Sequence, residues 1–125
     1  MNPSSHKDAA VDFLNLVNEG EIREAYEKYA APSFIHHNPH FKGDAESLAI
    51  AMEEHHKLFP NKVYEVKHVL EDGELVAVHG RVQLVEGGKT GALVHIFHFE
   101  NDKIVEMWDI GEEIPKDSPN ENGMF

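Results

Sequence analysis

The spacing of apolar residues changes abruptly at Pro60, and no other feature of the sequence constrains the fold as strongly. Before Pro60, apolar residues recur every three or four positions, which is the spacing of amphipathic helices. After Pro60 they alternate with polar residues, as in β-strands, and turn-forming pairs such as Asp72-Gly73 and Gly87-Gly88 separate the alternating runs. Helices followed by a run of strands indicate an α+β fold rather than alternating βαβ units.

Three helices are predicted in the first half of the chain. The first begins at a capping pair, Ser5 with Asp8, and ends at Gly20, while the second follows directly and is expected to end at Pro32. Asp44 is the predicted N-cap of the third helix. The three apolar stripes are Ala10, Phe13, Leu14 and Val17; Ile22, Ala25, Tyr26 and Tyr29; and Leu48, Ala51, Met52 and Phe59.

Four strands in an antiparallel meander are predicted after the helices, over residues 63–70, 75–85, 89–99 and 104–110. Residues 34–37 are a candidate for one further short strand. The helices would pack on one face of the curved sheet and enclose a pocket with it. The chain has the length of one domain, which we expect to cover residues 1–114, and the polar residues 115–125 are expected to form an extended tail.

The third strand of the meander is apolar on both of its faces. Leu93 and Phe97 point to one side, and Val94 and Ile96 point to the other. Only one face can pack on the helices, and no other part of the sequence remains to cover the second face. We therefore expect a second copy of the chain to cover it, in a homodimer.

Acidic residues dominate the charge of the chain, with 23 Asp and Glu against 11 Lys and Arg and a formal net charge of −12. Binding of nucleic acid requires a clustered basic surface, and an anionic membrane would repel this charge, so neither is an expected partner. Residues 1–8 lack the apolar run of a signal peptide, and no apolar stretch approaches the length of a membrane span. We expect a cytoplasmic protein.

The chain contains ten histidines and no cysteine. The lack of cysteine excludes disulfides and thiolate metal sites. Two pairs of adjacent histidines, His36-His37 and His55-His56, are of a residue type that binds metals, but neighbouring side chains on a strand or helix diverge. Neither pair can chelate an ion by itself, so we do not expect a metal.

Two segments resemble a known family. The segment Phe34-Ile35-His36-His37-Asn38-Pro39 resembles the aromatic-Ile-x-His-Asn-Pro stretch of SnoaL-like polyketide cyclases. Residues 95–109 are similar to the family block that ends in Lys-Ile-Val-Glu-His-Trp-Asp, and residues 72–79 with the Asn-Gly-Met-Phe ending are similar to SnoaL-like aldol-condensation proteins. The resemblance implies the cone fold shared with nuclear transport factor 2. Proteins of this fold are usually dimeric and have an open-mouthed pocket. The resemblance also implies chemistry that needs no cofactor.

The resemblance also implies roles for two residues. Asp109, in the Trp-Asp pair, would be the general acid/base of an intramolecular aldol ring closure, and His95 on the preceding strand would assist. Two positions depart from the family block, because Met107 stands where histidine is frequent and His98 stands where arginine is common. Either departure could alter the substrate.

From the residues alone, two questions about Asp109 stay open. The carboxylate could be structural or exposed instead of catalytic, because a buried charge needs a partner. A strict two-residue turn at Asn101-Asp102 would place His95 opposite Trp108, and only a longer turn or a β-bulge would place it opposite Asp109. A two-residue turn at Gly87-Gly88 would turn His79 away from His95, so we leave His79 outside the site.

Five further residues are candidates for contact with a substrate: His37, Asn38, His56, Phe97 and Met107. His37 and Asn38 could equally stabilise the turn before Pro39. One of the two histidines near the end of the third helix is expected at the pocket mouth, and Phe97 would exclude water from the site.

The function expected from these observations is cofactor-independent proton transfer next to a carbonyl of a small, fairly apolar molecule, in an aldol-type cyclisation or an isomerisation. One alternative is a non-catalytic protein that binds a small molecule in the same pocket. A second alternative is a dimeric interaction module with no ligand, whose pocket would be filled by its own side chains.

Overall fold

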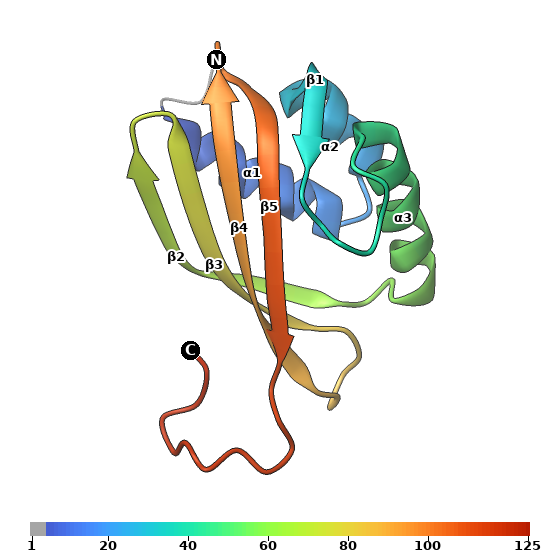
Figure 1. Cartoon of the computed structure of the whole chain (residues 1–125). Coiled ribbons are helices and arrows are strands. Elements are labelled where there is room, and N and C mark those ends of the chain that lie inside the picture. The colour runs from blue at the N-terminus through green and yellow to red at the C-terminus, as the bar shows by residue number, and fades with distance from the viewer. Residues whose placement is uncertain (1–4) are drawn as a thin grey trace.

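The structure is a computed structural model that describes residues 5–125, and Figure 1 shows its three helices and five strands. The helices and the meander follow the predicted order. The elements are α1 (His6–Asn18), α2 (Ile22–Tyr29), β1 (Ala30–His36), α3 (Ala45–Leu58), β2 (Val63–Asp72), β3 (Leu75–Gln83), β4 (Thr90–Glu100) and β5 (Lys103–Glu113).

The predicted N-caps are present. The Ser5 side chain accepts a hydrogen bond from the Asp8 backbone N–H at 3.4 Å, and Asp44 accepts one from the Ser47 N–H at 2.9 Å. These side chains satisfy backbone donors that the first turn of a helix leaves without a partner. The caps therefore explain why α1 and α3 begin where they do.

All five strands of the described chain form one sheet, in the order β1-β5-β4-β3-β2. The strands β2 to β5 make the predicted antiparallel meander, and β1 adds a parallel edge strand beside β5. The sheet is thus mixed, and the short strand considered at residues 34–37 is longer than expected.

Pro32 does not end the second helix, as the sequence had led us to expect. The helix α2 ends at Tyr29, and Pro32 lies inside β1. The pairing of β1 with β5 is irregular between Ala30 and Ile35, at the edge of the sheet. Proline has no N–H to donate to a ladder and is tolerated at such edges and irregularities.

The core lies between the helices and the inner face of the sheet, and Figure 1 shows α1 crossing behind the strands. The Phe13 ring of α1 meets the Phe97 ring of β4 edge to face, with ring centroids 5.7 Å apart. The largest fully buried side chains are Phe13, Phe97, Phe99, Ile22, Leu48, Ile104, Val76 and Val78. This packing fixes β4 and β5 against α1 at the end of the sheet near the turn that joins them.

The turn between β3 and β4 is longer than the predicted two-residue Gly87-Gly88 loop. Gln83 pairs with Thr90, so residues 84–89 form the connection and His79 lies opposite Val94 instead of Ile96. The predicted register of β3 against β4 is therefore wrong by two residues, and a shift of two residues leaves every side chain on its expected face. His79 therefore points away from the inner face, as predicted.

The tail after β5 has no helix or strand, and its last residue returns to the outer face of the sheet. The Phe125 ring stacks on the His79 ring at 6.2 Å, with Lys67 and Arg81 over the Phe125 ring at 5.9 and 5.8 Å. None of the helices within residues 5–125 is both long enough and apolar enough to cross a membrane.

Candidate functional site

A β-bulge in β5 brings the two predicted catalytic residues together. Asn101 and Asp102 have φ of 50° and 65°, as a two-residue hairpin turn requires, and Phe99 pairs with Ile104 beyond them. The register then shifts, so that His98 pairs with Glu106 and Val105 is left as the extra residue. His95 consequently lies opposite Asp109, which settles the open question of the turn.

The carboxylate of Asp109 has two neighbours, one at each oxygen. Its Oδ1 lies 3.4 Å from Nε2 of His95, and its Oδ2 accepts a hydrogen bond from Nδ2 of Asn38 at 2.8 Å. The side chains of His95 and Asp109 are 12% and 19% exposed, so both are largely removed from water. Asn38 follows β1, the strand beside β5, and its inclusion among the predicted site residues agrees with this contact.

The segment after β1 is itself held in place, which fixes the Asn38 amide. The backbone N–H of Asn38 donates to Nδ1 of His36 at 3.0 Å, and its Oδ1 accepts from the His40 N–H at 3.0 Å. His36 is buried, and its Nε2 contacts the Lys42 carbonyl at 2.7 Å. His36 therefore supports the site from beneath and does not face the cavity.

Burial controls the electrostatics of the site. It lowers the pKa of His95, and the charge of Asp109 opposes that effect without reversing it, so the neutral imidazole is favoured. Burial also raises the pKa of Tyr64 to about 12, with a further contribution from Asp109, so this phenol keeps its proton. Nδ1 of His95 and the hydroxyl of Tyr64 are buried and make no hydrogen bond among the described residues.

Tyr64 owes its position to a glycine. Its ring lies against Gly80 on the inner face, so close that a Cβ at residue 80 would approach the ring atoms to 2.6 Å. Any side chain there would displace the ring. Gly80 thus leaves the space in which Tyr64 reaches the electrostatic neighbourhood of Asp109.

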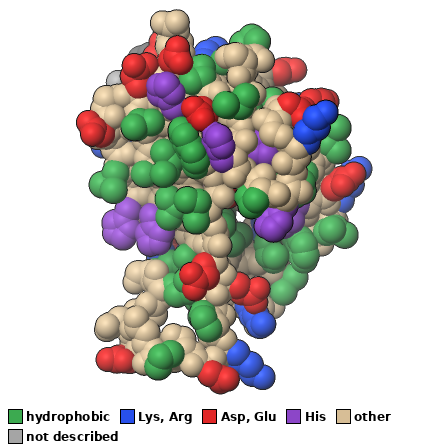
Figure 2. Space-filling view, viewed as in Figure 1, with side chains coloured by type: hydrophobic (Ala, Val, Ile, Leu, Met, Phe, Trp, Pro, Cys, Tyr) green, Lys and Arg blue, Asp and Glu red, His purple; other side chains and the backbone are tan. Residues whose placement is uncertain are grey.

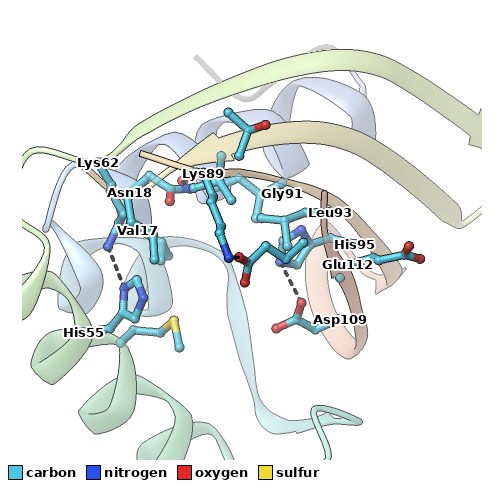
Figure 3. Close-up of a pocket in the computed structure, with 17 residues that line it drawn as sticks. Val17, Asn18, His55, Lys62, Lys89, Gly91, Leu93, His95, Asp109 and Glu112 are labelled. Atoms are coloured by element: carbon cyan, nitrogen blue, oxygen red, sulfur yellow. Dashed lines mark hydrogen bonds and ion pairs between the residues drawn. The ribbon is translucent and has the colours of Figure 1, made fainter. Parts of the chain in front are cut away.

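Asp109 and His95 line one end of a cavity of about 340 Å³, shown in Figure 3. This volume is in the range of small-molecule sites. The walls between its two ends are mainly apolar and include Leu14, Val17, Met52, Val82, Leu84 and Leu93.

The other end of the cavity carries His55 of α3 and Lys62, which Figure 3 shows well separated from His95 and Asp109. The Lys62 ammonium donates to Nδ1 of His55 at 3.1 Å. Burial lowers the pKa of Lys62, and burial together with the Lys62 charge lowers the pKa of His55. The His55 ring also packs on Phe59, with ring centroids 5.0 Å apart.

His37 does not belong to this cavity, contrary to the expectation from the sequence. Its ring stacks on Trp108 at 5.1 Å, and its Nε2 lies 2.6 Å from Oε2 of Glu106. Successive residues of a strand point to opposite faces, and His36 occupies the inner one. His37 and Glu106 therefore lie on the outer face.

The choice between the two histidines of α3 was also wrong. His55 lines the cavity, whereas His56 packs over Gly20, where its Nε2 lies 2.4 Å from the position of a Cβ. Phe97 and Met107 pair with each other in the core, 0% and 3% exposed, and neither lines the cavity. They lie in the core beneath the site, outside the lining of the cavity.

Sequence reasoning missed Lys62 and Tyr64 altogether. Among the residues at this end of the cavity, only His55 had a signal in the sequence, because it lies on the apolar stripe of its helix. Within residues 5–125, no group of three or more histidine or acidic side chains is arranged to hold a metal ion.

The fold and the cavity define a cone-shaped α+β protein with a small-molecule pocket. Residues 10–107 match the model of the SnoaL-like domain, and the chain belongs to this family. The expected resemblance and the α+β cone fold are thus confirmed, apart from the added strand β1. A search of curated proteins finds no match.

Solved structures of the same fold come from several bacteria. AclR of Streptomyces galilaeus, a candidate hydroxylase, has a TM-score of 0.73 at 21% identity, covering 86% of this chain and 88% of that chain. IdmH of Streptomyces antibioticus, a candidate polyketide cyclase, gives 0.70 at 19% identity, covering 86% and 92%. An NTF2-like protein of unknown function from Cytophaga hutchinsonii gives 0.70 at 20% identity, covering 89% and 93%. At these identities the likeness is one of fold.

Proposed function

We propose that this protein catalyses proton transfer at a carbon next to a carbonyl group of a small, largely apolar molecule, leading to an aldol-type cyclisation or an isomerisation. The observation that carries the proposal is the Asp109 carboxylate, which lies between His95 and Asn38 at the end of an apolar cavity. A carboxylate that is oriented and largely removed from water is suited to accept and return a proton. Membership of the SnoaL-like family agrees with this chemistry.

In the proposed reaction Asp109 takes the proton from carbon, and the electron pair moves onto the carbonyl oxygen to form an enolate. The 3.4 Å between His95 Nε2 and Asp109 Oδ1 is longer than a normal hydrogen bond, so an Nε2–H is available to the enolate oxygen. The enolate carbon then attacks a second carbonyl, or it takes the proton back at another position. Asn38 keeps Oδ2 occupied and so orients the other oxygen of the carboxylate.

The experiment is to replace Asp109 with Asn and to follow deuterium exchange next to the carbonyl of small aryl ketones by NMR. The amide keeps the size of the side chain but cannot accept the proton, so exchange should fall on the order of 100- to 10,000-fold. Glu106→Gln is the matched control, because Glu106 is another strand β5 carboxylate in contact with a histidine, but on the outer face. It should leave the exchange rate unchanged.

The melting temperature of both variants must be measured on the same samples. If Asp109 were only structural, its replacement would destabilise the protein, by roughly 3–5 kcal/mol for a broken buried pair, with no specific loss of exchange. A stable Asp109→Asn variant with the parental exchange rate would exclude Asp109 as the base. A parent protein that binds the ketones without any exchange would instead favour the non-catalytic binding protein.

The cavity argues against the remaining alternative, an interaction module without a ligand. Such a module would fill the space between helices and sheet with its own side chains. About 340 Å³ remains open, and much of its wall is formed by apolar side chains. A bound small molecule is the simpler explanation of this space.

We also propose that the protein is a homodimer that pairs through the outer face of the sheet. Figure 2 views this face, where hydrophobic side chains gather over the strands. Val94 and Ile110 lie opposite each other there, and Ile110 is 59% exposed. Sedimentation at micromolar concentration should give a dimer for the parent and a monomer for Ile110→Lys. A monomeric parent would refute the proposal.

A further inference from the structure

One cation in the cavity has no carboxylate partner. Lys89 forms an ion pair with Glu113 at 3.2 Å, and His95 lies beside Asp109. Lys62 instead contacts only an imidazole, His55, and the ion pairs found among residues 5–125 do not include it. Its positive charge faces the cavity without compensation, although the chain carries an excess of acidic groups.

Two features show that Lys62 is not simply a solvated surface lysine. The side chain is half-buried, and that burial lowers its pKa, because the ammonium has lost water without gaining an anion. An ammonium has three protons to donate, and the bond to His55 uses one of them. The bond also holds the lysine in one orientation at the cavity wall, so its remaining donors are in place for a ligand.

The remaining acidic group on the cavity rim does not compensate Lys62. Glu112 lies opposite Ala92 in the β4–β5 ladder, and Ala92 is an odd number of positions from His95. The Glu112 side chain therefore lies on the outer face of the sheet, opposite to the face that carries His95. Since no ion pair among residues 5–125 includes Lys62, a carboxylate partner for it would have to come from the ligand.

We infer that Lys62 binds a carboxylate of the substrate, so that the pocket takes an oxo acid. The carboxylate would lie at the Lys62 end, the reacting carbonyl at the His95–Asp109 end, and an apolar segment along the walls between them. The inference rests on the proposed function for its carbonyl half. A single ammonium, with no guanidinium among the cavity residues, suits one negative charge better than the two of a phosphate.

The test compares aryl oxo acids of increasing chain length with their methyl esters, which carry one added methyl group and lack the negative charge. Binding to the 125-residue chain is measured by NMR titration. At least one acid should bind about tenfold or more tightly than its ester, since a hydrogen bond to a charged group is worth about 1.5–3 kcal/mol. Lys62→Met keeps the apolar stem and should remove this preference, while leaving ester binding unchanged.

Lys57→Met is the matched control, because Lys57 is exposed, lies in the last turn of α3 and does not line the cavity. It changes the net charge by the same amount and should keep the preference for the acid. Equal binding of acid and ester by the parent, an acid preference that survives Lys62→Met, or no binding of any acid at millimolar concentration would each overturn the inference.

The outcome is separate from that of the proposed function. Deuterium exchange next to the carbonyl is measured on the esters, which lack the charge that Lys62 would recognise. Exchange that depends on Asp109, without an acid preference, would refute the carboxylate site alone. An acid preference that depends on Lys62, without exchange in any compound, would refute the proton transfer alone and leave the acid-binding site standing.

Discussion

The two halves of the β4–β5 hairpin differ on the inner face of the sheet, because one half is buried in the core and the other lines the cavity. Near the turn, Phe97 and Phe99 are fully buried and pair with Met107 and Ile104 in a closed core. Farther from the turn, the His95–Asp109 pair and the residues beyond it line an open cavity. The change occurs within two residues along each strand, from the Phe97–Met107 pair to the His95–Asp109 pair.

This difference shows how the fold positions a polar pair without exposing it. The side chains of the closed half are buried, and because protein interiors are close-packed, we expect them to hold the backbone of both strands in place up to the edge of the cavity. The open half gives a ligand access to the pair through the cavity. A bound molecule would find the carboxylate already oriented and largely free of water, which strengthens electrostatic interactions in the site.

The largest difference between the two halves should appear in stability. Phe97→Ala should reduce the free energy of unfolding by about 3–5 kcal/mol, because it removes a fully buried ring and leaves a hole. Leu93→Ala should cost less, since Leu93 already borders open space. Urea denaturation of both variants measures the gap. Equal losses would mean that the cavity half is packed as tightly as the core.

A smaller effect is expected where the cavity half is crowded. Gly80→Ala places a methyl group against the Tyr64 ring and should cost about 1–3 kcal/mol, the usual range for overpacking. Gly43→Ala is the control, because the added carbon would meet only the His36 carbonyl at an ordinary 3.5 Å. Thermal unfolding distinguishes them, and a neutral Gly80→Ala would show that Tyr64 moves freely.

The smallest effect concerns pH. The folded-state pKa of His95 lies below its unfolded value of 6.5, so the unfolded chain binds the proton first as pH falls. This contribution to stability is complete above pH 6.5 and is lost below it, at up to about 1.4 kcal/mol per pH unit.

Denaturation of the parent and of His95→Gln between pH 7.5 and 5 measures this slope. The variant should lose part of the pH dependence and keep the part due to His55, whose pKa is also lowered. An NMR titration that places the pKa of His95 above 6.5 would contradict the prediction.

Much of the fold could be predicted because its signals are local. The change of period at Pro60 separates helices from strands, and the caps at Ser5 and Asp44 are each read from four residues. Pro32 misled the prediction, because a proline ends most helices and its presence in an edge strand depends on a neighbour far along the chain. The tight Gly87-Gly88 turn failed for a related reason, since glycine permits several loop lengths.

The site was predicted in part, and the errors concern the face of the strand or helix to which a side chain points. Asp109, His95 and Asn38 came from motifs that resemble a family, and the structure brings all three together. His37 and His56 were each one residue away from the inward-facing histidine, because a short strand or helix end does not reveal which face is buried. Lys62 has no sequence signal, since a lysine after a helix usually points to solvent.

The bulge at Val105 also determines which changes of length the site can tolerate. Val105 is a spare residue in the ladder, so its deletion would leave Phe99 opposite Ile104 and His95 opposite Asp109 in a regular hairpin. Loss of Trp108 cannot be absorbed in this way while Met107 stays opposite Phe97, and it would carry the carboxylate to the outer face. Among chains of this fold, a spacing between the hairpin turn and the Trp-Asp pair that is one residue shorter should therefore retain the chemistry only where the missing residue is the bulge residue, so that a histidine still lies opposite the carboxylate.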